Sequence, residues 1–439
     1  MASRLLGLDG LVVTDVDDDG GARVVHVVTA PGRPVCPGCR TPSEHPKCWV
    51  VTSPRDLPAG GVAVRLVWHK RRWYCRSAGC RRVSFTESVP QVPPRARITS
   101  RLRVAAGVAV RDGGCTIAQS AREHDLSWPT VAAAFAMVAA AVLPCEPPAT
   151  TLLGIDETRR GRPRYRLDPD TGQRVCTAER WHTGFVDLAG AHGLLGQVPG
   201  RAAADAGGWL AARTPAWRAA VRVVAIDMCS AYRAAVREHL PHAQLVVDHF
   251  HLVQLANRTM AEVRRRVVAT VRGRRGRKSD PEYGVRRRLG RNLEDLRADQ
   301  LEDMFTRLET LGDAGEHIKC AYIAKEELRA LLKLARTGAN HHQIRHRLAT
   351  FHTWCAAYDI PELHRLASTV EQWWPEILAF LDTGITNAAS EGTNRVIKLE
   401  ARNAYGFRNP TNQQLRSRAA STRRHRRTLT THRPRSRTG

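Results

Sequence analysis

The stretch VVAIDMCSAYRAAVREHLPHAQLVVDHFH, residues 223–251, decides the fold expected of this chain. An apolar run ends at Asp227, a helical segment follows to His239, and Pro241 ends that segment before a second apolar run at 244–247. This order predicts a strand, a helix and a second strand of a buried parallel sheet. Because open α/β sheets bind ligands at the carboxyl ends of their strands, Asp227 is a candidate site residue.

Three further apolar runs precede this stretch, at 152–155, 181–188 and 194–198, and the first of them ends at Asp156. The expected order is three strands in succession, followed by helix, strand, helix, strand and helix. A ribonuclease H-like α/β domain has this order, with its first and fourth strands side by side. Asp156 and Asp227 would then lie at the carboxyl ends of neighbouring strands.

The composition points to a nucleic-acid partner. The 439 residues carry a formal net charge of +26, and an excess of this size attracts polyphosphate. Arginine outnumbers lysine, which suits phosphate binding through the planar guanidinium group, although a GC-rich genome would also raise the arginine content. With 43% hydrophobic residues, the chain can bury a core and divides into roughly three domains by length.

Neither a membrane span nor an export signal is expected. No run of 18 or more apolar residues occurs, and the first 21 residues are acidic where a signal peptide would be basic. We therefore expect a cytosolic protein. The 11 cysteines are an odd number spread over a long chain, which argues against a disulfide framework.

The N-terminal region, 1–90, is predicted to be a β-rich zinc-ribbon domain. Its cysteines form one CxxC pair and one CxxxxC pair on either side of a strand-like stretch, namely Cys36, Cys39, Cys75 and Cys80. Four thiolates on two such turns would hold one structural Zn²⁺ in a closed tetrahedron. Four buried free cysteines are the alternative.

Basic and aromatic residues alternate near these cysteines and suggest a DNA-binding surface. The alternative is a strand with one face in solvent and the other in the core. The cationic candidates for DNA contact are Lys70, Arg71, Arg72, Arg81 and Arg82.

The next region, 95–145, is predicted to be a helix-turn-helix DNA-binding domain. Thr99 or Ser100 can cap its first helix, and Ser127 can cap its third. The third helix carries no basic residue, so Trp128 and Thr130 are its only candidate groove contacts, and a purely packing role is the alternative.

The remaining chain is divided into four parts. Residues 150–257 are assigned to the first part of the ribonuclease H-like core, 258–380 to a charged helical insertion, and 381–415 to a C-terminal helix that completes the core. On that helix, Glu391 shares a face with Arg395, and Lys398 lies next to them. Residues 416–439 are predicted to be a basic tail that is disordered without DNA.

Taken together, these segments resemble the ISL3 family of transposases over nearly the whole chain. The resemblance is carried by CPGC with CRSAGCRRVSFTE, the helix-turn-helix, LLGIDETRRGRPRY, the opening stretch extended by Leu252, and SEGTNRVIKLEARNAYGFRNPTNQQLR. The family is similar to other DDE transposases, whose ribonuclease H-like core holds two aspartates and a glutamate. By motif, these are Asp156, Asp227 and Glu391. Pro410 departs from the family pattern, which tends to have an aromatic residue there.

The resemblance implies a transposase that binds double-stranded DNA at the terminal inverted repeats of its element and acts on target DNA. Two Mg²⁺ ions, or Mn²⁺, would be held by Asp156, Asp227 and Glu391 for strand cleavage and strand transfer. Arg395 and Lys398 would contact DNA, and the pairing of two DNA ends implies a homodimer or larger assembly. A catalytically silent regulator or decayed copy is the alternative, as is a nuclease or resolvase that cuts without strand transfer.

Overall fold

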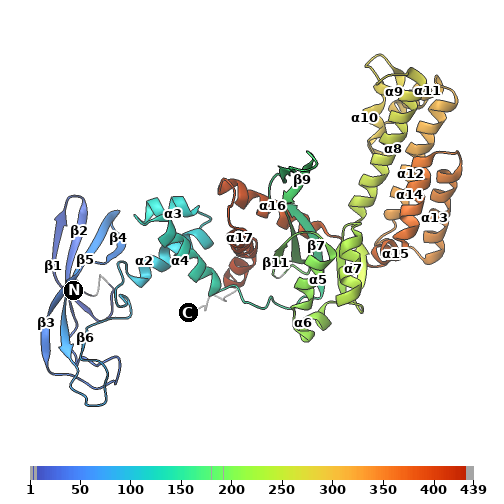
Figure 1. Ribbon diagram of the computed structural model, residues 1–439. Coiled ribbons are helices and arrows are strands. Elements are labelled where there is room, and N and C mark those ends of the chain that lie inside the picture. Colours follow the sequence, from blue (N-terminus) through green and yellow to red (C-terminus); the bar gives the residue numbers. More distant parts are fainter. Residues whose placement is uncertain (1–2, 4–6, 179, 191, 432–439) are drawn as a thin grey trace, which may run out of the picture. The chain divides into compact units, whose positions relative to one another are not determined.

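The computed structural model describes residues 3, 7–178, 180–190 and 192–431, which form two compact units (Figure 1). The first unit joins residues 1–145 to the C-terminal segment from Glu400, and the second consists of residues 146–399. Helix α16, Ala388–Asn403, passes from the second unit into the first. The C-terminal part of the segment predicted to complete the core, from Glu400 to residue 415, thus groups with the N-terminal unit instead.

The N-terminal unit begins with a six-stranded sheet centred on one long strand, β5. Strands β2, β3, β4 and β6 all pair with β5, and β1 extends the sheet beyond β2. The strands are β1 Leu11–Asp19, β2 Ala22–Thr29, β3 Pro46–Thr52, β4 Arg55–Ala59, β5 Val62–Tyr74 and β6 Ser84–Thr86.

Three short helices follow the sheet: α2 Ser100–Arg111, α3 Ile117–Glu123 and α4 Trp128–Ala140. Thr99 and Thr116 cap the first two, because their hydroxyl oxygens accept hydrogen bonds from backbone N–H groups of the first turn. Ser127 precedes α4 without a side-chain bond to its backbone.

The C-terminal tail differs from its predicted disorder. Residues Pro410–Thr431 form helix α17, whose Ala419 is buried in the core of the three short helices. Arg416 of α17 and Glu400 form an ion pair at 2.8 Å, and both side chains are buried. The apolar packing and this buried pair explain why a sequence of low hydrophobicity is ordered here. The last part of the tail, 432–439, lies outside the described residues.

The second unit contains a five-stranded sheet with the order β11-β10-β7-β12-β13. Strand β12 runs parallel to both β7 and β13, while β10 is antiparallel to β7 and β11. Numbered along the sheet, the order is 3-2-1-4-5, so the first and fourth strands are neighbours and the predicted ribonuclease H-like topology is confirmed. The strands are β7 Leu152–Arg159, β10 Trp181–Asp187, β11 Leu194–Pro199, β12 Val223–Ile226 and β13 Gln244–Val247.

Between β7 and β10, the chain forms a separate two-stranded hairpin of β8 Arg164–Leu167 and β9 Arg174–Ala178. The remaining helices of the sheet domain are α5 Ala203–Ala211, α6 Pro215–Ala220 and α7 Ser230–His239.

The predicted insertion is helical throughout most of its length and shares one continuous apolar core with the sheet. Its elements are α8 His249–Arg272, α9 Pro281–Gly284, α10 Arg286–Leu289, η1 Leu293–Asp295, α11 Ala298–Glu309, α12 Asp313–Leu332, α13 His341–Ala356, α14 Pro361–Gln372 and α15 Trp374–Thr383. Within the described residues, none of the helices is long and apolar enough to cross a membrane.

Candidate active site

The register of two parallel strands brings two predicted catalytic residues together. Ile155 of β7 pairs with Ile226 of β12, and this is the last pair of the ladder. Asp156 and Asp227 are the next residues on the two strands, so both emerge at the same edge of the sheet. Strands β7 and β12 are buried through Ile155 and Ile226, which fixes the register and therefore the separation of the two carboxylates.

A third carboxylate joins this pair. Asp156, Glu157 and Asp227 each offer a carboxylate oxygen within 4.8 Å of the other two. Burial, followed by the charge of Asp227, raises the pKa of Asp156 to about 7, and burial likewise raises the pKa of Glu157. Repulsion among these carboxylates destabilises the folded protein when no metal ion is bound.

Hydrogen bonds fix the orientation of Asp156. One carboxylate oxygen accepts from the Glu157 backbone N–H at 2.7 Å, and the other accepts from the Asn394 side-chain amide at 2.6 Å. The Asn394 oxygen in turn accepts a hydrogen bond from the Thr158 hydroxyl at 2.5 Å. A side chain on α16, more than 230 residues along the chain, thus orients a carboxylate on β7.

Asp227 is oriented by a histidine. The Nε2 atom of His251, in the first turn of α8, lies 3.0 Å from Asp227 Oδ1. This interaction raises the pKa of His251, against the opposing effect of its burial. Asp248, the residue after β13, caps α8 by accepting a hydrogen bond from the Phe250 backbone N–H. It therefore places His251 at the site.

Helix α16 packs closely on β7 because Gly154 has no side chain. A Cβ atom at Gly154 would lie only 2.3 Å from the Ser390 hydroxyl and 2.6 Å from the Asn387 side-chain oxygen. The Asn387 amide also donates to the Ile155 carbonyl at 3.2 Å. This close approach packs Asn387, Ser390 and Asn394 of α16 against β7.

Glu391 itself is not in the carboxylate cluster. Its side chain is 61% exposed and forms an ion pair at 2.7 Å with Arg395, one turn further along α16. It nevertheless lies between Asn387 and Asn394 on the helix, and both of these contact β7. The structure thus unites Asp156 and Asp227 with Glu157 and leaves Glu391 on the adjoining helix.

The carboxylate cluster fits a divalent cation. Hard cations such as Mg²⁺ take carboxylate oxygens as ligands, and they need only a few of them. Three converging carboxylates, of which Asp156 has a raised pKa, would gain from a bound positive charge. The residues that could hold such an ion here are Asp156, Asp227 and Glu157.

The four predicted zinc ligands also come together. Cys36 Sγ lies 3.9 Å from Cys80 Sγ, and Cys39 Sγ lies 3.6 Å from Cys75 Sγ. Zinc–sulfur bonds of about 2.3 Å in a tetrahedron require sulfur atoms about 3.8 Å apart. Backbone N–H groups of Gly38 and Arg82 also point at Cys36 and Cys80, each at 3.4 Å. The four thiols therefore fit one structural Zn²⁺.

The basic residues beside the zinc site are available to a partner. Arg71, Arg72, Arg81 and Arg82 are exposed, and Arg71 lies over the ring of Trp49, 4.5 Å from its centre. Lys70 is half-buried and lies 4.3 Å from the centre of the Trp68 ring.

The two candidate contacts of the helix-turn-helix have local partners. Trp128 is 50% exposed and lines a cavity of about 340 Å³ together with residues 403–409 of the C-terminal segment. The Thr130 hydroxyl is hydrogen-bonded to that of Ser127 at 2.8 Å. On α16, Lys398 is exposed, whereas Arg395 is held by Glu391.

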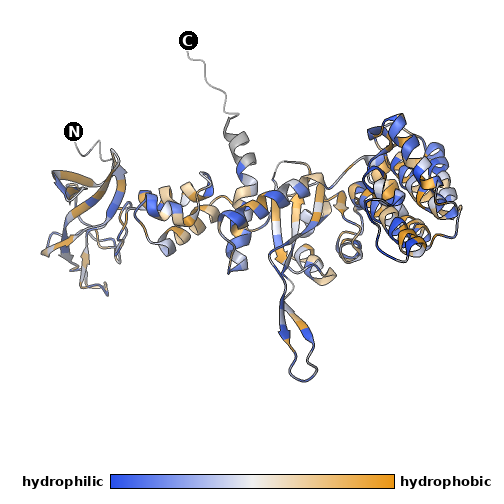
Figure 2. Ribbon diagram, turned by 90° about the horizontal axis from the view of Figure 1, so that it is seen from above, coloured by the Kyte–Doolittle hydropathy of each residue, from blue (hydrophilic) through white to orange (hydrophobic). Residues whose placement is uncertain are grey.

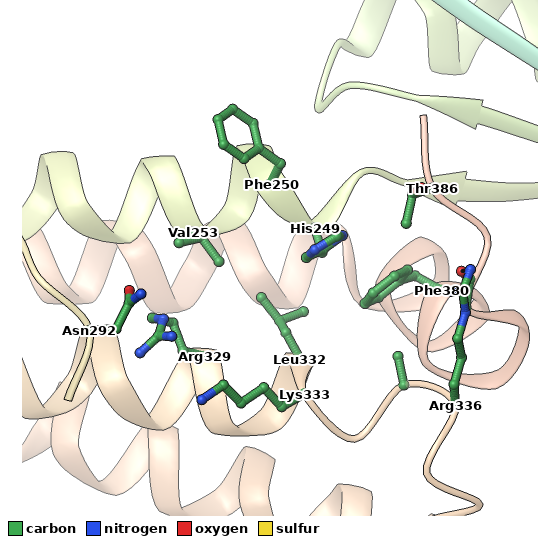
Figure 3. A pocket seen from close by; sticks show the side chains of 12 residues that line it. His249, Phe250, Val253, Asn292, Arg329, Leu332, Lys333, Arg336, Phe380 and Thr386 are labelled. Carbon is green, nitrogen blue, oxygen red and sulfur yellow. Dashed lines mark hydrogen bonds between the residues drawn. The ribbon is translucent and has the colours of Figure 1, made fainter. Parts of the chain in front are cut away.

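A larger cavity, of about 410 Å³, lies within the helical insertion where α8 begins (Figure 3). His249 stacks on Phe380 at its wall, with ring centres 4.8 Å apart. The cations around it have protein partners: Arg329 and Lys333 both bind Glu294, and Arg336 binds the Gly384 carbonyl. The cavity therefore offers few free positive charges to a phosphate.

Some members of the site were not predicted from the sequence. His251 was not expected at Asp227, and Glu157 was not among the residues assigned to the site. The HxH pattern after Asp248 was the available indication of His251, because the second histidine falls in the first turn of a helix that starts at the strand end.

Comparisons with known proteins agree with this architecture. A family model described as a transposase, the DDE domain of ISL3 elements, matches residues 153–417. A model for the zinc finger of the transposases of IS204, IS1001, IS1096 and IS1165 matches residues 32–80, and a helix-turn-helix model of the ISL3 transposase family matches residues 87–139.

Individual relatives are distant. The transposase of insertion sequence element IS1001 from Bordetella parapertussis is 26% identical over 374 residues, or 83% of each chain. The transposase of IS1557 from Mycobacterium tuberculosis is 28% identical over 237 residues, which cover 49% of this chain and 51% of that protein. Among solved structures, the Drosophila P element transposase strand transfer complex matches 72% of this chain and 90% of its own, with 10% identity and a TM-score of 0.37 that is too low to support an argument.

The transposase model alone spans more than half of the chain, and the two smaller models match the regions before it in the expected order. The chain therefore belongs to the ISL3 family of insertion-sequence transposases and is a DNA transposase of the DDE type.

Proposed function

We propose that this transposase binds the terminal inverted repeats of its element and catalyses Mg²⁺-dependent strand cleavage and strand transfer at the edge formed by Asp156 and Asp227. The observation that carries the proposal is the parallel register of β7 and β12, in which Asp156 within β7 and Asp227 directly after β12 both follow the last paired residues. Mn²⁺ has the same ligand preference and would serve in place of Mg²⁺.

In this proposal, Asp156 and Asp227 hold two ions between them, and Glu391 completes the coordination of one. Bound Mg²⁺ would activate the attacking oxygen and stabilise the leaving oxygen of an in-line displacement at phosphorus. Asn394 keeps one oxygen of Asp156 oriented, and His251 does the same for Asp227. Glu391 would have to turn away from Arg395, an exposed ion pair whose loss costs little.

Glu157 competes with Glu391 for the third position because it already lies in the cluster. Two substitutions separate them. If Glu391 is the third ligand, Glu391→Gln abolishes cleavage and Glu157→Gln retains it; the reverse result would assign the position to Glu157.

DNA contacts are proposed for two further surfaces. The first is beside the zinc site, with Lys70, Arg71, Arg72, Arg81 and Arg82, and the second is the helix-turn-helix with Trp128 and Thr130. Arg395, once released by Glu391, and Lys398 would contact the phosphates close to the cleavage position. Since two element ends must be joined, we also propose that the protein acts as a homodimer or larger assembly.

The test is cleavage of a labelled duplex that spans one end of the element, with and without Mg²⁺. Asp156→Asn and Asp227→Asn should each abolish cleavage while binding of the same duplex persists. Asp299→Asn is the matched control, because Asp299 is an exposed carboxylate of the insertion, paired with Arg297. Unchanged cleavage by both aspartate variants would refute the proposal.

The same assay addresses the alternatives. A DNA-binding regulator would hold the duplex without cutting it under any condition. A resolvase-like nuclease would cut but would not join the new 3′ end to a target duplex.

A further inference from the structure

The hairpin between β7 and β10, residues 159–180, is not used by the proposed chemistry, although it grows directly from the strand that carries Asp156. Arg159 of β7 is still paired with Trp181 of β10, and beyond this pair the chain leaves the sheet as the two strands β8 and β9. Figure 2 shows this two-stranded arm projecting from the five-stranded sheet. We name residues 159–180 the basic hairpin.

Its charge is strongly one-sided. Seven arginines stand against three carboxylates, Asp168, Asp170 and Glu179, which leaves four net positive charges in 22 residues. The arginines are Arg159, Arg160, Arg162, Arg164, Arg166, Arg174 and Arg180.

The carboxylate of Asp168, at the hairpin tip, forms its hydrogen bonds within the turn. Asp168 accepts hydrogen bonds from the backbone N–H groups of Asp170 and Thr171, at 2.9 and 3.0 Å. Gly172, with φ of 64°, completes the turn in the left-handed region that glycine adopts readily. The tip is therefore a defined turn, and the Asp168 carboxylate bonds to the turn backbone and not to an arginine.

Four arginines of the hairpin have no acidic partner in the described part of the chain: Arg164 and Arg166 of β8, Arg174 of β9, and Arg162 just before β8 form no ion pair there. Arg174 instead lies over the ring of Tyr165, 5.3 Å from its centre. Near the base of the hairpin, burial and the neighbouring cations Arg180 and Arg164 lower the pKa of Arg160. Arg164, Arg166 and Arg174 thus carry positive charge without an ion pair among the described residues, as at a surface that receives an anionic partner.

Large hydrophobic side chains on the hairpin are also exposed. Tyr165, Leu167 and Val175 are 51%, 64% and 49% exposed. An isolated two-stranded ribbon is only marginally stable in water, so both of its faces gain from contact with another surface. The side chains of β8 alternate, with Arg164 and Arg166 on one face and Tyr165 and Leu167 on the other.

Double-stranded DNA matches this combination of shape and charge. The major groove is about 12 Å wide and admits a two-stranded ribbon, and its walls are lined with phosphates that guanidinium groups bind in bidentate fashion. Tyrosine and aliphatic side chains can contact sugars and bases within the groove.

The distance between the hairpin arginines and Asp156 determines which base pairs the hairpin can contact. Arg164 follows Asp156 by eight residues, which span at most roughly 26 Å when extended. DNA rises about 3.4 Å per base pair, so this reach corresponds to about eight base pairs.

We propose that the basic hairpin binds the groove of duplex DNA within about ten base pairs of the cleavage position and holds the scissile strand against Asp156 and Asp227. This inference rests on the proposed function for the location of the cleavage position, but the DNA contact itself requires no catalysis. The hairpin would act by positioning, since none of its residues lies in the carboxylate cluster.

The first experiment is site-specific photocrosslinking with the full-length chain. Benzoylphenylalanine replaces Tyr165 in the Asp156→Asn background, and the protein is irradiated with a labelled duplex that spans an element end. The expected product is a protein–DNA adduct within about ten base pairs of that end. The same amino acid at Tyr358, an exposed tyrosine of the insertion, is the matched control and should give no such adduct.

Two outcomes would overturn the inference. Adducts formed only with a second copy of the chain would identify the hairpin as a contact between subunits, and an absence of DNA adducts at Tyr165 would remove the contact altogether. Because Asp156→Asn prevents cleavage by design, the photocrosslinking variant is also prepared with Asp156 intact. If that protein crosslinks to the duplex but never cuts it, the proposed function alone is refuted.

The second experiment measures the salt dependence of binding to a labelled 30-base-pair duplex. The triple variant Arg164→Ala/Arg166→Ala/Arg174→Ala should bind at least about tenfold more weakly, and the slope of log affinity against log salt should shrink by about 0.9 for each lost phosphate contact. Replacing the same three residues by lysine should restore most of the slope, because the charge remains.

The matched control removes three exposed cations from a loop of the insertion, Arg275→Ala/Arg277→Ala/Lys278→Ala. It loses the same formal charge, so an equal loss of affinity and slope in both triple variants would show a general charge effect and contradict the inference.

Discussion

Two regions of the second unit use charge in opposite ways. The helical insertion pairs several of its arginines with buried carboxylates. The active edge, which we define as Asp156, Glu157, Asp227 and the basic hairpin, instead places like charges side by side, with carboxylates in the cluster and an excess of arginines in the hairpin. In the insertion, Arg266 binds Glu362, Arg272 binds Glu282 and Arg274 binds Asp280, at 2.8 to 3.0 Å.

The charges of the insertion pairs stabilise the fold, whereas the charges of the active edge are available to bind a ligand. The three carboxylates of the insertion pairs are at most 8% exposed, and each has its own arginine. The carboxylates of the active edge have one another as neighbours, which raises the pKa of Asp156 in addition to the effect of burial. Such repulsion between carboxylates is typical of functional sites, where a bound ligand compensates the negative charge.

The largest expected effect tests the paired region. In Arg272→Ala, the Glu282 carboxylate, 1% exposed, loses its arginine, so the free energy of unfolding should fall by about 3 kcal/mol. Urea denaturation followed by far-ultraviolet circular dichroism measures this change.

A double variant shows whether the loss of stability comes from the buried Glu282 carboxylate that has lost its arginine. Arg272→Met/Glu282→Leu replaces both charges by apolar groups of similar size and should recover stability to within about 1 kcal/mol of the wild type. If the double variant were as unstable as the single one, the pair would not explain the loss.

The next largest effect is an increase in the free energy of unfolding, and it tests the carboxylate cluster. The pKa of Asp156 is raised to about 7 in the folded protein, from a model-compound value of 3.8. The stability that this group contributes is therefore fully present below about pH 4 and is lost as the pH rises through 7. Asparagine cannot ionise, so Asp156→Asn should stabilise the metal-free protein by about 2 kcal/mol at pH 8 and by much less at pH 5.

The addition of Mg²⁺ provides a second test of this prediction. Addition of Mg²⁺ at pH 8 should raise the melting temperature of the wild type and narrow or remove the advantage of Asp156→Asn, because bound cation relieves the repulsion. An Asp156→Asn protein less stable than the wild type at pH 8 without Mg²⁺ would show that the hydrogen bonds of Asp156 outweigh the repulsion among the carboxylates.

The sheet was predictable from the sequence because its central strands are short apolar runs that end at Asp156 and Asp227, and their order fixes the topology. The hairpin was missed, since an arginine-rich segment has no apolar run to mark its strands. The alternation of Arg164, Tyr165, Arg166 and Leu167, followed by a turn that contains Gly172, was the available indication.

The site was predictable only in part, for a physical reason. Strand register determines the relation of Asp156 to Asp227, and register follows from the apolar pattern. The contacts of Asn394 and His251 depend on how helices pack on the sheet over long chain separations, which no local pattern specifies. The Glu391–Arg395 ion pair, by contrast, follows from the i, i+4 spacing of the two residues on one helix, which the sequence already shows.

The smallest effect on stability is expected in the hairpin, and it distinguishes the two regions most directly. Arg166→Ala removes an exposed guanidinium without an acidic partner in the described residues, so the free energy of unfolding should change by less than about 0.5 kcal/mol. Its affinity for duplex DNA should nevertheless fall, with a decrease of about 0.9 in the salt slope for the one lost phosphate contact. Urea denaturation and fluorescence anisotropy on the same preparations, with Arg272→Ala as the counterpart, provide both values. If Arg166→Ala lost stability and kept its full salt slope, the hairpin arginine would have a structural role like those of the insertion, and the contrast between the two regions would disappear.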